Sequence, residues 1–136
     1  MIYLLDTNVV SEPGKSRPDP TVTRWLQAVP TNNIRISVLV IGQIRCGVES
    51  VRRRDPSAGD RLDSWFDTLL HDFRDQLVPV STEIADLWGR LILPDRLPEV
   101  DGLLAATALA HNWTIVTRNV KDFERTGVRL LNPFSD

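Results

Sequence analysis

The sequence predicts a small α/β domain in which a parallel β-sheet is flanked by helices on both faces. Two observations predict this fold: short apolar runs recur along the chain, and longer stretches with apolar residues at helical spacing separate them. The chain has 136 residues, 42% of them hydrophobic, which is enough to bury one core. Its single cysteine, Cys46, has no partner for an internal disulfide. We therefore expect one domain over residues 1–136, in a reducing compartment.

Five short segments have the composition of buried strands. The first is an apolar run that stops at Asp6, and the second ends on the small hydroxyl residue Ser37. A carboxyl or hydroxyl group at such a point can also cap the helix that follows. The expected strands are residues 2–5, 34–37, 76–80, 113–117 and 127–131.

Amphipathic stretches between the strands predict helices. Asp19-Pro20 and Asp55-Pro56 each supply a capping aspartate followed by proline at the first helical position. Because the helix before Asp55 and the helix after it follow one another directly, we expect them to form a hairpin. The expected helices are residues 9–12, 20–29, 38–54, 56–70, 82–91 and 100–110.

Charge and hydropathy exclude some classes of protein. A net charge of −2 and a pI near 5.7 argue against non-specific coating of nucleic acid, which requires a strongly basic surface. They leave room for an enzyme that handles nucleic acid through a metal, because a bound cation reverses the local sign of an acidic site. The apolar run at the N-terminus is too short to span a membrane and follows no basic segment, so we expect a cytoplasmic protein with no membrane partner.

Polar residues that are far apart in the sequence are expected to meet at one edge of the sheet. Asp6 follows the first strand, Gln43 lies early in the helix after the second, and Asp101 opens an alanine-rich helix. Asn119 and Asp122 follow the fourth strand. In a parallel α/β sheet, ligands bind in the crevice outside the carboxyl ends of the strands. The spacing therefore predicts a polar, acidic site at that edge.

Each of these residues also has a purely structural explanation. Residues 6–8 are of the types that cap helices, and Asp101 would be favoured by the helix dipole. Asn119 and Asp122 would suit a turn, and Gln43 could simply be solvated. The sequence leaves these alternatives open for each residue taken singly.

Taken together, the motifs resemble those of the PIN-domain ribonucleases, and within them the toxins of the VapC and FitB type. Order and spacing agree over essentially the whole chain, which we therefore expect to form a single PIN-like domain. The matching stretches are residues 4–12, 36–49, 101–108 and 116–123, followed by Asn132-Pro133. Because four separated motifs occur together, the resemblance is specific.

The resemblance implies a metal-dependent endoribonuclease toxin that cleaves RNA in an acidic pocket binding Mg²⁺ or Mn²⁺. Hard divalent cations prefer carboxylate oxygens and water, so acids at these positions suit such an ion. The residues that match the family's metal-binding or catalytic acids are Asp6, Asp101 and Asp122. The residues that match the polar groups beside those acids are Thr7, Asn8, Thr117 and Asn119.

The fourth acidic position of the family is occupied here by Gln43. Glutamine keeps the shape of glutamate but loses its charge, and it places NH₂ donors where an acceptor is needed. We therefore expect lower activity than that of a Gln43→Glu variant. The sequence leaves open whether the natural protein carries glutamine or whether this chain is an inactivated variant.

The resemblance also implies partners. They are the RNA substrate, a second copy of the chain in a homodimer, and a cognate antitoxin whose tail enters the acidic pocket, where an arginine would pair with carboxylates. DNA would be reached only indirectly, through the antitoxin. An alternative is a catalytically silent PIN-fold binding module within an antitoxin/DNA repressor complex, and Gln43 favours it.

Basic and aromatic residues are less informative. A solvated helix face is the alternative to RNA binding for the arginines of residues 38–54. The basic residues that could hold RNA phosphates are Arg45, Arg52, Arg53, Arg54, Lys15, Arg17, Arg118 and Lys121. The tryptophans expected in the core or in a dimer interface are Trp25, Trp65 and Trp88.

Overall fold

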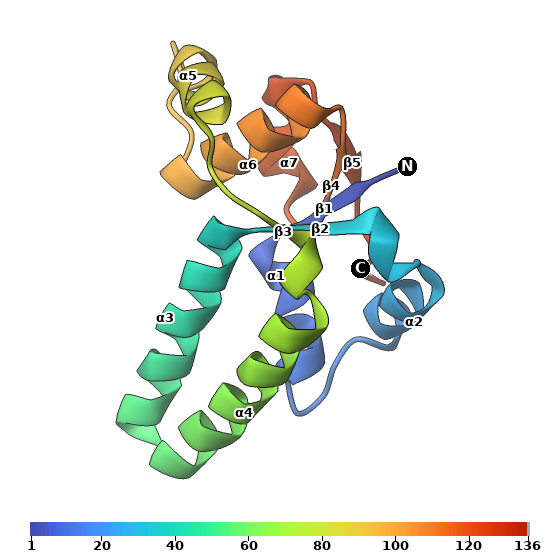
Figure 1. The fold of residues 1–136 in the computed structure, drawn as a ribbon, viewed down its shortest axis with the longest axis vertical. Coiled ribbons are helices and arrows are strands. Elements are labelled where there is room, and N and C mark those ends of the chain that lie inside the picture. Colours follow the sequence, from blue (N-terminus) through green and yellow to red (C-terminus); the bar gives the residue numbers. More distant parts are fainter. Residues whose placement is uncertain (136) are drawn as a thin grey trace.

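A computed structural model describes residues 1–135, and these residues form one parallel five-stranded sheet in the order β3-β2-β1-β4-β5 (Figure 1). The strands are β1 (Tyr3–Leu5), β2 (Ile34–Ser37), β3 (Leu77–Val78), β4 (Thr114–Val116) and β5 (Arg129–Leu131). Each was expected; β2 has the predicted bounds, and the other four strands are shorter than predicted.

Helices cover both faces of the sheet, which confirms the predicted three-layer α/β/α architecture. In Figure 1, α5 and α6 lie on one side of the strands, and the long α3–α4 hairpin projects from the other. The α-helices are α1 (Thr7–Val10), α2 (Pro20–Ala28), α3 (Val38–Arg54), α4 (Pro56–Asp72), α5 (Thr82–Leu91), α6 (Glu99–His111) and α7 (Val120–Phe123). Short 3₁₀ turns are η1 (Glu12–Gly14), η2 (Thr31–Asn33), η3 (Arg74–Gln76) and η4 (Glu124–Thr126).

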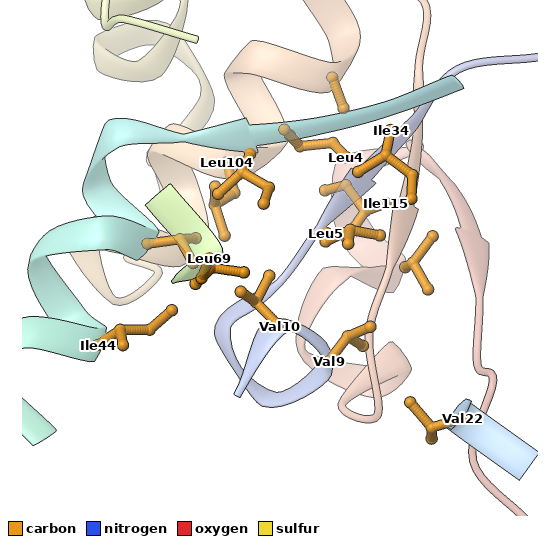
Figure 2. Close-up of a cluster of buried hydrophobic side chains, with 14 of the residues drawn as sticks. Leu4, Leu5, Val9, Val10, Val22, Ile34, Ile44, Leu69, Leu104 and Ile115 are labelled. Carbon is orange, nitrogen blue, oxygen red and sulfur yellow. The ribbon is translucent and has the colours of Figure 1, made fainter. Parts of the chain in front are cut away.

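The core surrounds the central strand β1. Leu4 is fully buried and Leu5 is 2% exposed, since β1 lies between β2 and β4 and helices cover both faces of the sheet. Figure 2 shows their side chains gathered with those of neighbouring strands and helices, including Val10 of α1, Leu69 of α4 and Leu104 of α6. The strand β1 is therefore central in the sheet, and its position fixes the main chain of Asp6, which follows it directly.

The expected helical hairpin is confirmed, and Asp55 forms its corner. The N–H of Asp55 donates to the carbonyl oxygen of Val51, which closes α3, and its Oδ1 accepts from the N–H of Ala58 at 3.2 Å, which opens α4. Ser37 caps the start of α3 by accepting from the N–H of Leu39. Both helices thus begin on the capping residues that the sequence indicated.

Two of the arginines considered for RNA binding instead join α3 to α4. Arg45 lies 3.0 Å and Arg52 2.6 Å from the two carboxylate oxygens of Asp63. Their hydrogen bonds, first that of Arg52 and then that of Arg45, hold the pKa of Asp63 below its usual range. Glu49 accepts from both arginines. These two guanidinium groups therefore link the helices of the hairpin, which neither RNA binding nor a solvated helix face had described.

The tryptophans pack as expected. Trp25 meets Tyr3 edge-on, with ring centres 5.2 Å apart, and Trp65 lies against Gly14 of η1. Trp88 of α5 covers Gly102 of α6. In each case the ring contacts a neighbouring element, so these residues contribute to packing within the chain.

A prediction for stability concerns Gly59, where the backbone of α4 lies against Arg52 of α3. A Cβ atom at Gly59 would lie 2.5 Å from the Cα and Cβ of Arg52, so Gly59→Ala must push the two helices apart. We expect it to lower the free energy of unfolding by about 1–3 kcal/mol, measured by chemical denaturation. Gly89→Ala is the matched control, because no atom lies within 4 Å of its Cβ position. That variant should be neutral or gain up to about 1 kcal/mol, and equal losses for both would contradict the close crossing.

Within residues 1–135, no helix has the length and apolar character needed to cross a membrane.

Candidate acidic site

The strand order of the sheet changes direction at β1, and this creates a switch point between β1 and β4. From β1 the chain moves outward to β2 and β3, and it then returns to place β4 on the other side of β1. The carboxyl ends of β1 and β4 are adjacent, since the N–H of Asp6 donates to the carbonyl oxygen of Val116 at 2.9 Å. Such a switch point is where open α/β sheets bind ligands.

Asp6 occupies this switch point and is 7% exposed. Its Oδ1 accepts from the N–H of Thr7 at 2.8 Å, and Asp6 is the N-cap of α1. The prediction that Asp6 caps a helix is therefore confirmed. Its Oδ2 accepts from the hydroxyl of Thr117 at 2.8 Å and from Nδ2 of Asn8 at 3.4 Å. The carboxylate is therefore held from both flanking segments, and capping accounts for only one of its oxygens.

The polar residues that were expected beside the acids form a connected network. Asn8 reaches Thr117 Oγ1 at 3.4 Å through Nδ2, and its Oδ1 accepts from the N–H of Arg118 at 3.1 Å. The N–H of Asn119 donates to Thr117 Oγ1 at 3.0 Å. Thr117 thus donates its one proton to Asp6 and uses its lone pairs as acceptors, which fits a hydroxyl group. The segments after β1 and β4 are locked together around Asp6.

Gln43 reaches the same edge because α3 begins directly after β2. The hydroxyl of Thr7 donates to Oε1 of Gln43, which links α3 to the residue beside Asp6. The Gln43 residue is exposed, as its structural alternative expects. Solvation does not explain the whole position of Gln43, however, since its side-chain oxygen contacts Thr7 beside Asp6.

Asp101 and Asp122 complete the set of residues that the sequence singled out. The helix α6 packs on β4 and connects to the strand's start, so its first turn, with Asp101, lies toward the strand's carboxyl end. Burial raises the pKa of Asp101, and the negative charges of Asp6 and Asp122 raise it further. Asp122 lies in the first turn of α7. Its N–H donates to the carbonyl oxygen of Asn119 at 3.1 Å, so the expected turn is present and leads into the short helix α7.

The carboxylate of Asp6 is also repelled by a neighbouring negative charge. Burial raises its pKa most, the hydrogen bonds from Thr117 and Thr7 oppose that rise, and the charge of Asp122 adds to it. The structure thus brings Asp6, Asp101 and Asp122 near enough for their charges to act on one another. Among residues 1–135, however, no three His, Cys, Asp or Glu side chains are grouped closely enough to hold a metal ion by themselves. A cation here would need water or substrate oxygens among its ligands, which is usual for Mg²⁺.

This repulsion makes a prediction about stability and pH. Because the folded pKa of Asp101 lies above its ordinary value of 3.8, ionised Asp101 costs stability at neutral pH, and the cost disappears below that value. Asp101→Asn cannot ionise, so without divalent ions we expect a higher melting temperature near neutral pH and a shrinking gain as the pH falls. Asp75→Asn, at an exposed position, is the control. A gain independent of pH would contradict the electrostatic cause.

Glu12 is a buried acid, 3% exposed, for which the sequence indicated no separate role. Its carboxylate lies 3.0 Å from the ammonium of Lys15 and accepts from the N–H of Asp19 at 3.3 Å. Glu12 therefore fixes the loop between η1 and α2, and it places Lys15 there rather than over the acids. A buried glutamate in an otherwise polar stretch carries no periodic signal that would have revealed it.

Two hollows lie beside the α3–α4 hairpin instead of over the acids. One, of about 230 Å³, lies between the sheet, α2 and α4, and the other, of about 760 Å³, lies between the loop after α1 and the hairpin. Trp65 lines both, whereas Asp6, Gln43, Asp101 and Asp122 line neither. The acidic site is therefore distinct from both.

A parallel α/β sheet with three interacting acids at its switch point agrees with the family match: residues 3–128 fit the PIN domain model, and the chain belongs to the PIN domain family. Among curated relatives, the chain is 29% identical to "VapC ribonuclease Y4jK" of Sinorhizobium fredii, covering 98% of both chains. It is 27% identical to "Toxin FitB" of Neisseria gonorrhoeae, covering 99% of this chain and 100% of the relative.

A solved structure has the same fold as this chain. The crystal structure of FitAcB from Neisseria gonorrhoeae superimposes with a TM-score of 0.88 at 26% identity, covering 97% of this chain and 98% of that one. Other structures of the same fold are toxin–antitoxin complexes, some of them bound to DNA. The named relatives are thus a ribonuclease and a toxin.

Proposed function

We propose that this protein is a metal-dependent endoribonuclease and the toxin of a toxin–antitoxin pair. The observation that carries the proposal is that the negative charges of Asp6 and Asp122 raise the pKa of Asp101, in a chain that belongs to the PIN domain family. Because RNA is the proposed substrate, we place the activity in the cytoplasm.

The residues at this edge fit a hard divalent cation, Mg²⁺ or Mn²⁺. Asp6 is a buried carboxylate whose charge is opposed by burial and by Asp122, so a cation would relieve an existing cost. Asp6 and Asp101 would hold the ion, directly or through water, and Asp122 would complete the acidic set. When bound, such an ion polarises a phosphoryl oxygen and lowers the pKa of a bound water. Thr117 and Asn8 keep Asp6 in a single orientation throughout.

Gln43 occupies the fourth acidic position of the family, and in this proposal it lowers the rate of RNA cleavage. Its amide oxygen accepts from Thr7, but it brings no charge to a site in which three carboxylates attract the cation. Loss of one charge among four weakens the attraction for a divalent ion and removes a proton acceptor.

Three protein or nucleic-acid partners belong to this proposal. RNA is the substrate, a second copy of the chain forms a homodimer, and a cognate antitoxin inserts an arginine among the carboxylates, where a bidentate pair is strong. DNA is contacted through the antitoxin alone. The solved structures of FitAB and VapBC2 bound to DNA support the antitoxin and the indirect contact with DNA.

The direct test is cleavage of a structured, end-labelled RNA with Mg²⁺ or Mn²⁺. We expect discrete cuts that EDTA abolishes and that added Mn²⁺ restores. Binding is checked independently of catalysis by the melting temperature, which should rise with the logarithm of the Mg²⁺ concentration once that concentration exceeds the dissociation constant. Cleavage that persists in EDTA would contradict the metal dependence, and absence of cleavage by both this chain and Gln43→Glu would contradict the nuclease.

A second candidate function is a catalytically silent binding module acting within an antitoxin/DNA repressor complex. Gln43 is the observation that favours it, since an amide at this position suits binding better than catalysis. Tight binding of an antitoxin without RNA cleavage, even by Gln43→Glu, would select this function.

A further inference from the structure

The indole ring of Trp88 lies against the first turn of α6, which is the turn that carries Asp101. A Cβ atom at Gly102 would lie 3.0 Å from both Cδ1 and Nε1 of Trp88, so the ring is packed directly on the Gly102 main chain. Gly102 is buried and follows Asp101 directly in the sequence. Trp88 and Asp101 are therefore linked through a single peptide unit.

The first turn of α6 is not held by a side-chain cap. It follows residues 92–98, which form neither helix nor strand, and its N-cap residue, Pro98, makes no side-chain hydrogen bond to it. The position of the turn therefore depends on packing, and α5 packs along α6 (Figure 1). Ile92, the C-cap residue of α5, adds a second contact, with its Cγ2 3.2 Å from the same Cβ position.

The indole N–H of Trp88 is a buried donor that has no hydrogen-bond partner among residues 1–135. A buried donor without an acceptor lowers stability, and a phenylalanine ring would avoid this cost. Most buried polar groups are paired, so an exception requires an explanation. Stability does not supply one, whereas the contact with Gly102 does, because it fixes the main chain beside Asp101.

Resting on the function proposed above, we propose that Trp88 is a positioning residue for Asp101. Its ring holds the first turn of α6 in place, so the Asp101 carboxylate is in position before a divalent cation binds. A group that is already in position loses less conformational freedom on binding. Residues that orient metal ligands change metal affinity in this way without touching the ion. Trp88 itself contacts neither the ion nor the RNA.

The test measures the affinity for Mg²⁺ without RNA. Melting temperatures over a series of Mg²⁺ concentrations give an apparent Kd for each variant, and the value without Mg²⁺ shows whether the variant is folded. We expect Trp88→Leu to raise this Kd about tenfold, the lower end of the effects of groups that orient metal ligands. Trp88→Phe keeps an aromatic ring and should restore most of the affinity. Trp25→Leu is the matched control, because Trp25 is also half-buried but packs on Tyr3, at the opposite end of β1 from Asp6.

Gly102→Ala tests the same contact from the side of α6. The added methyl group would meet Trp88, so we expect it to displace the turn and to raise the Kd for Mg²⁺ about three- to tenfold. When Gly102→Ala is combined with Trp88→Leu, the smaller side chain leaves room for the methyl group. The combined loss should then be smaller than the product of the two single losses. Gly89→Ala on α5 is the control, since no atom lies within 4 Å of its Cβ position.

A spectroscopic signal separates positioning from stability. The four tryptophans give four indole N–H signals in a proton–nitrogen NMR spectrum, and each is assigned by its loss when that tryptophan is replaced by phenylalanine. Because the Trp88 N–H lies next to Gly102, we expect its signal to shift when Mg²⁺ binds, while the Trp25 signal stays unchanged. In the cleavage assay, Trp88→Leu should be slow at low Mg²⁺ and should approach the rate of the unchanged protein at saturating Mg²⁺, since Trp88 does not touch the reacting atoms.

The outcomes distinguish this inference from the function on which it rests. If Mg²⁺ raises the melting temperature and RNA is cut, but Trp88→Leu and Trp25→Leu have the same Kd for Mg²⁺, the role of Trp88 is overturned alone. If the double variant loses affinity by the full product of the single losses, the contact with Gly102 is not what positions Asp101. If neither this chain nor Gln43→Glu binds Mg²⁺ or cuts RNA, the proposed function fails and this inference fails with it.

Discussion

Asp6→Asn is expected to reduce metal-dependent RNA cleavage by about 10²- to 10³-fold, the range seen when one preorganised charge-stabilising group is lost. Asp6 lies at the switch point, is 7% exposed and is oriented by hydrogen bonds from both flanking segments. Asparagine keeps the shape and one acceptor but removes the charge that attracts a cation. The measurement is the initial rate of cleavage of end-labelled RNA at saturating Mn²⁺.

The control for this loss is Asp67→Asn, an exposed aspartate on α4, which should cleave RNA at the rate of the unchanged protein. Melting temperatures with and without Mg²⁺ separate a folding defect from a metal defect. Asp6→Asn should be folded and should respond less to Mg²⁺. An Asp6→Asn variant that cleaves at the original rate would remove the chemical basis of the proposal.

Gln43→Glu is expected to increase cleavage by about 10- to 100-fold, the range of effects that supporting groups of metal sites have on affinity or activity. The substitution is nearly isosteric, and a glutamate oxygen can accept from Thr7 as the amide oxygen does. The new charge adds to those of Asp6, Asp101 and Asp122, so the apparent affinity for Mg²⁺ should rise with the rate. Mg²⁺ titrations of rate and of melting temperature measure the two effects.

Gln27→Glu on α2 makes the same chemical change at an exposed position and should alter neither the rate nor the response to Mg²⁺. Equal rates for this chain and Gln43→Glu would show that position 43 has no essential part in catalysis. A higher affinity for Mg²⁺ without faster cleavage would instead confine its role to ion binding.

Much of the fold could be predicted because local signals agree with each other. The helix α3 was predicted over its full length, since its cap at Ser37, its apolar spacing and its C-terminal arginines all indicate the same bounds. The helix α7 was missed because it is four residues long and begins without a side-chain cap. The strand order was also beyond the sequence, since it depends on crossovers and not on local patterns.

In the candidate site too, some features could be predicted from the sequence and others could not. That Asp6, Asp101 and Asp122 approach one another follows from strand ends sharing an edge, which the sequence allowed us to anticipate. That Arg45 and Arg52 face α4 could not be anticipated, because charged residues outside an apolar stripe look alike whether they meet water or a neighbouring helix. Glu12 likewise acquires its surroundings only through tertiary contacts.

The position of β1 between β2 and β4 affects when the protein can become active during its synthesis. A ribosome produces β1 first, yet the hydrogen bond from Asp6 to Val116 and the hydroxyl of Thr117 require the last quarter of the chain. A nascent or prematurely terminated polypeptide therefore contains its first acid without the groups that orient it. Under the proposed function, an incomplete translation product that ends before Val116 lacks the contacts that hold the Asp6 carboxylate in place.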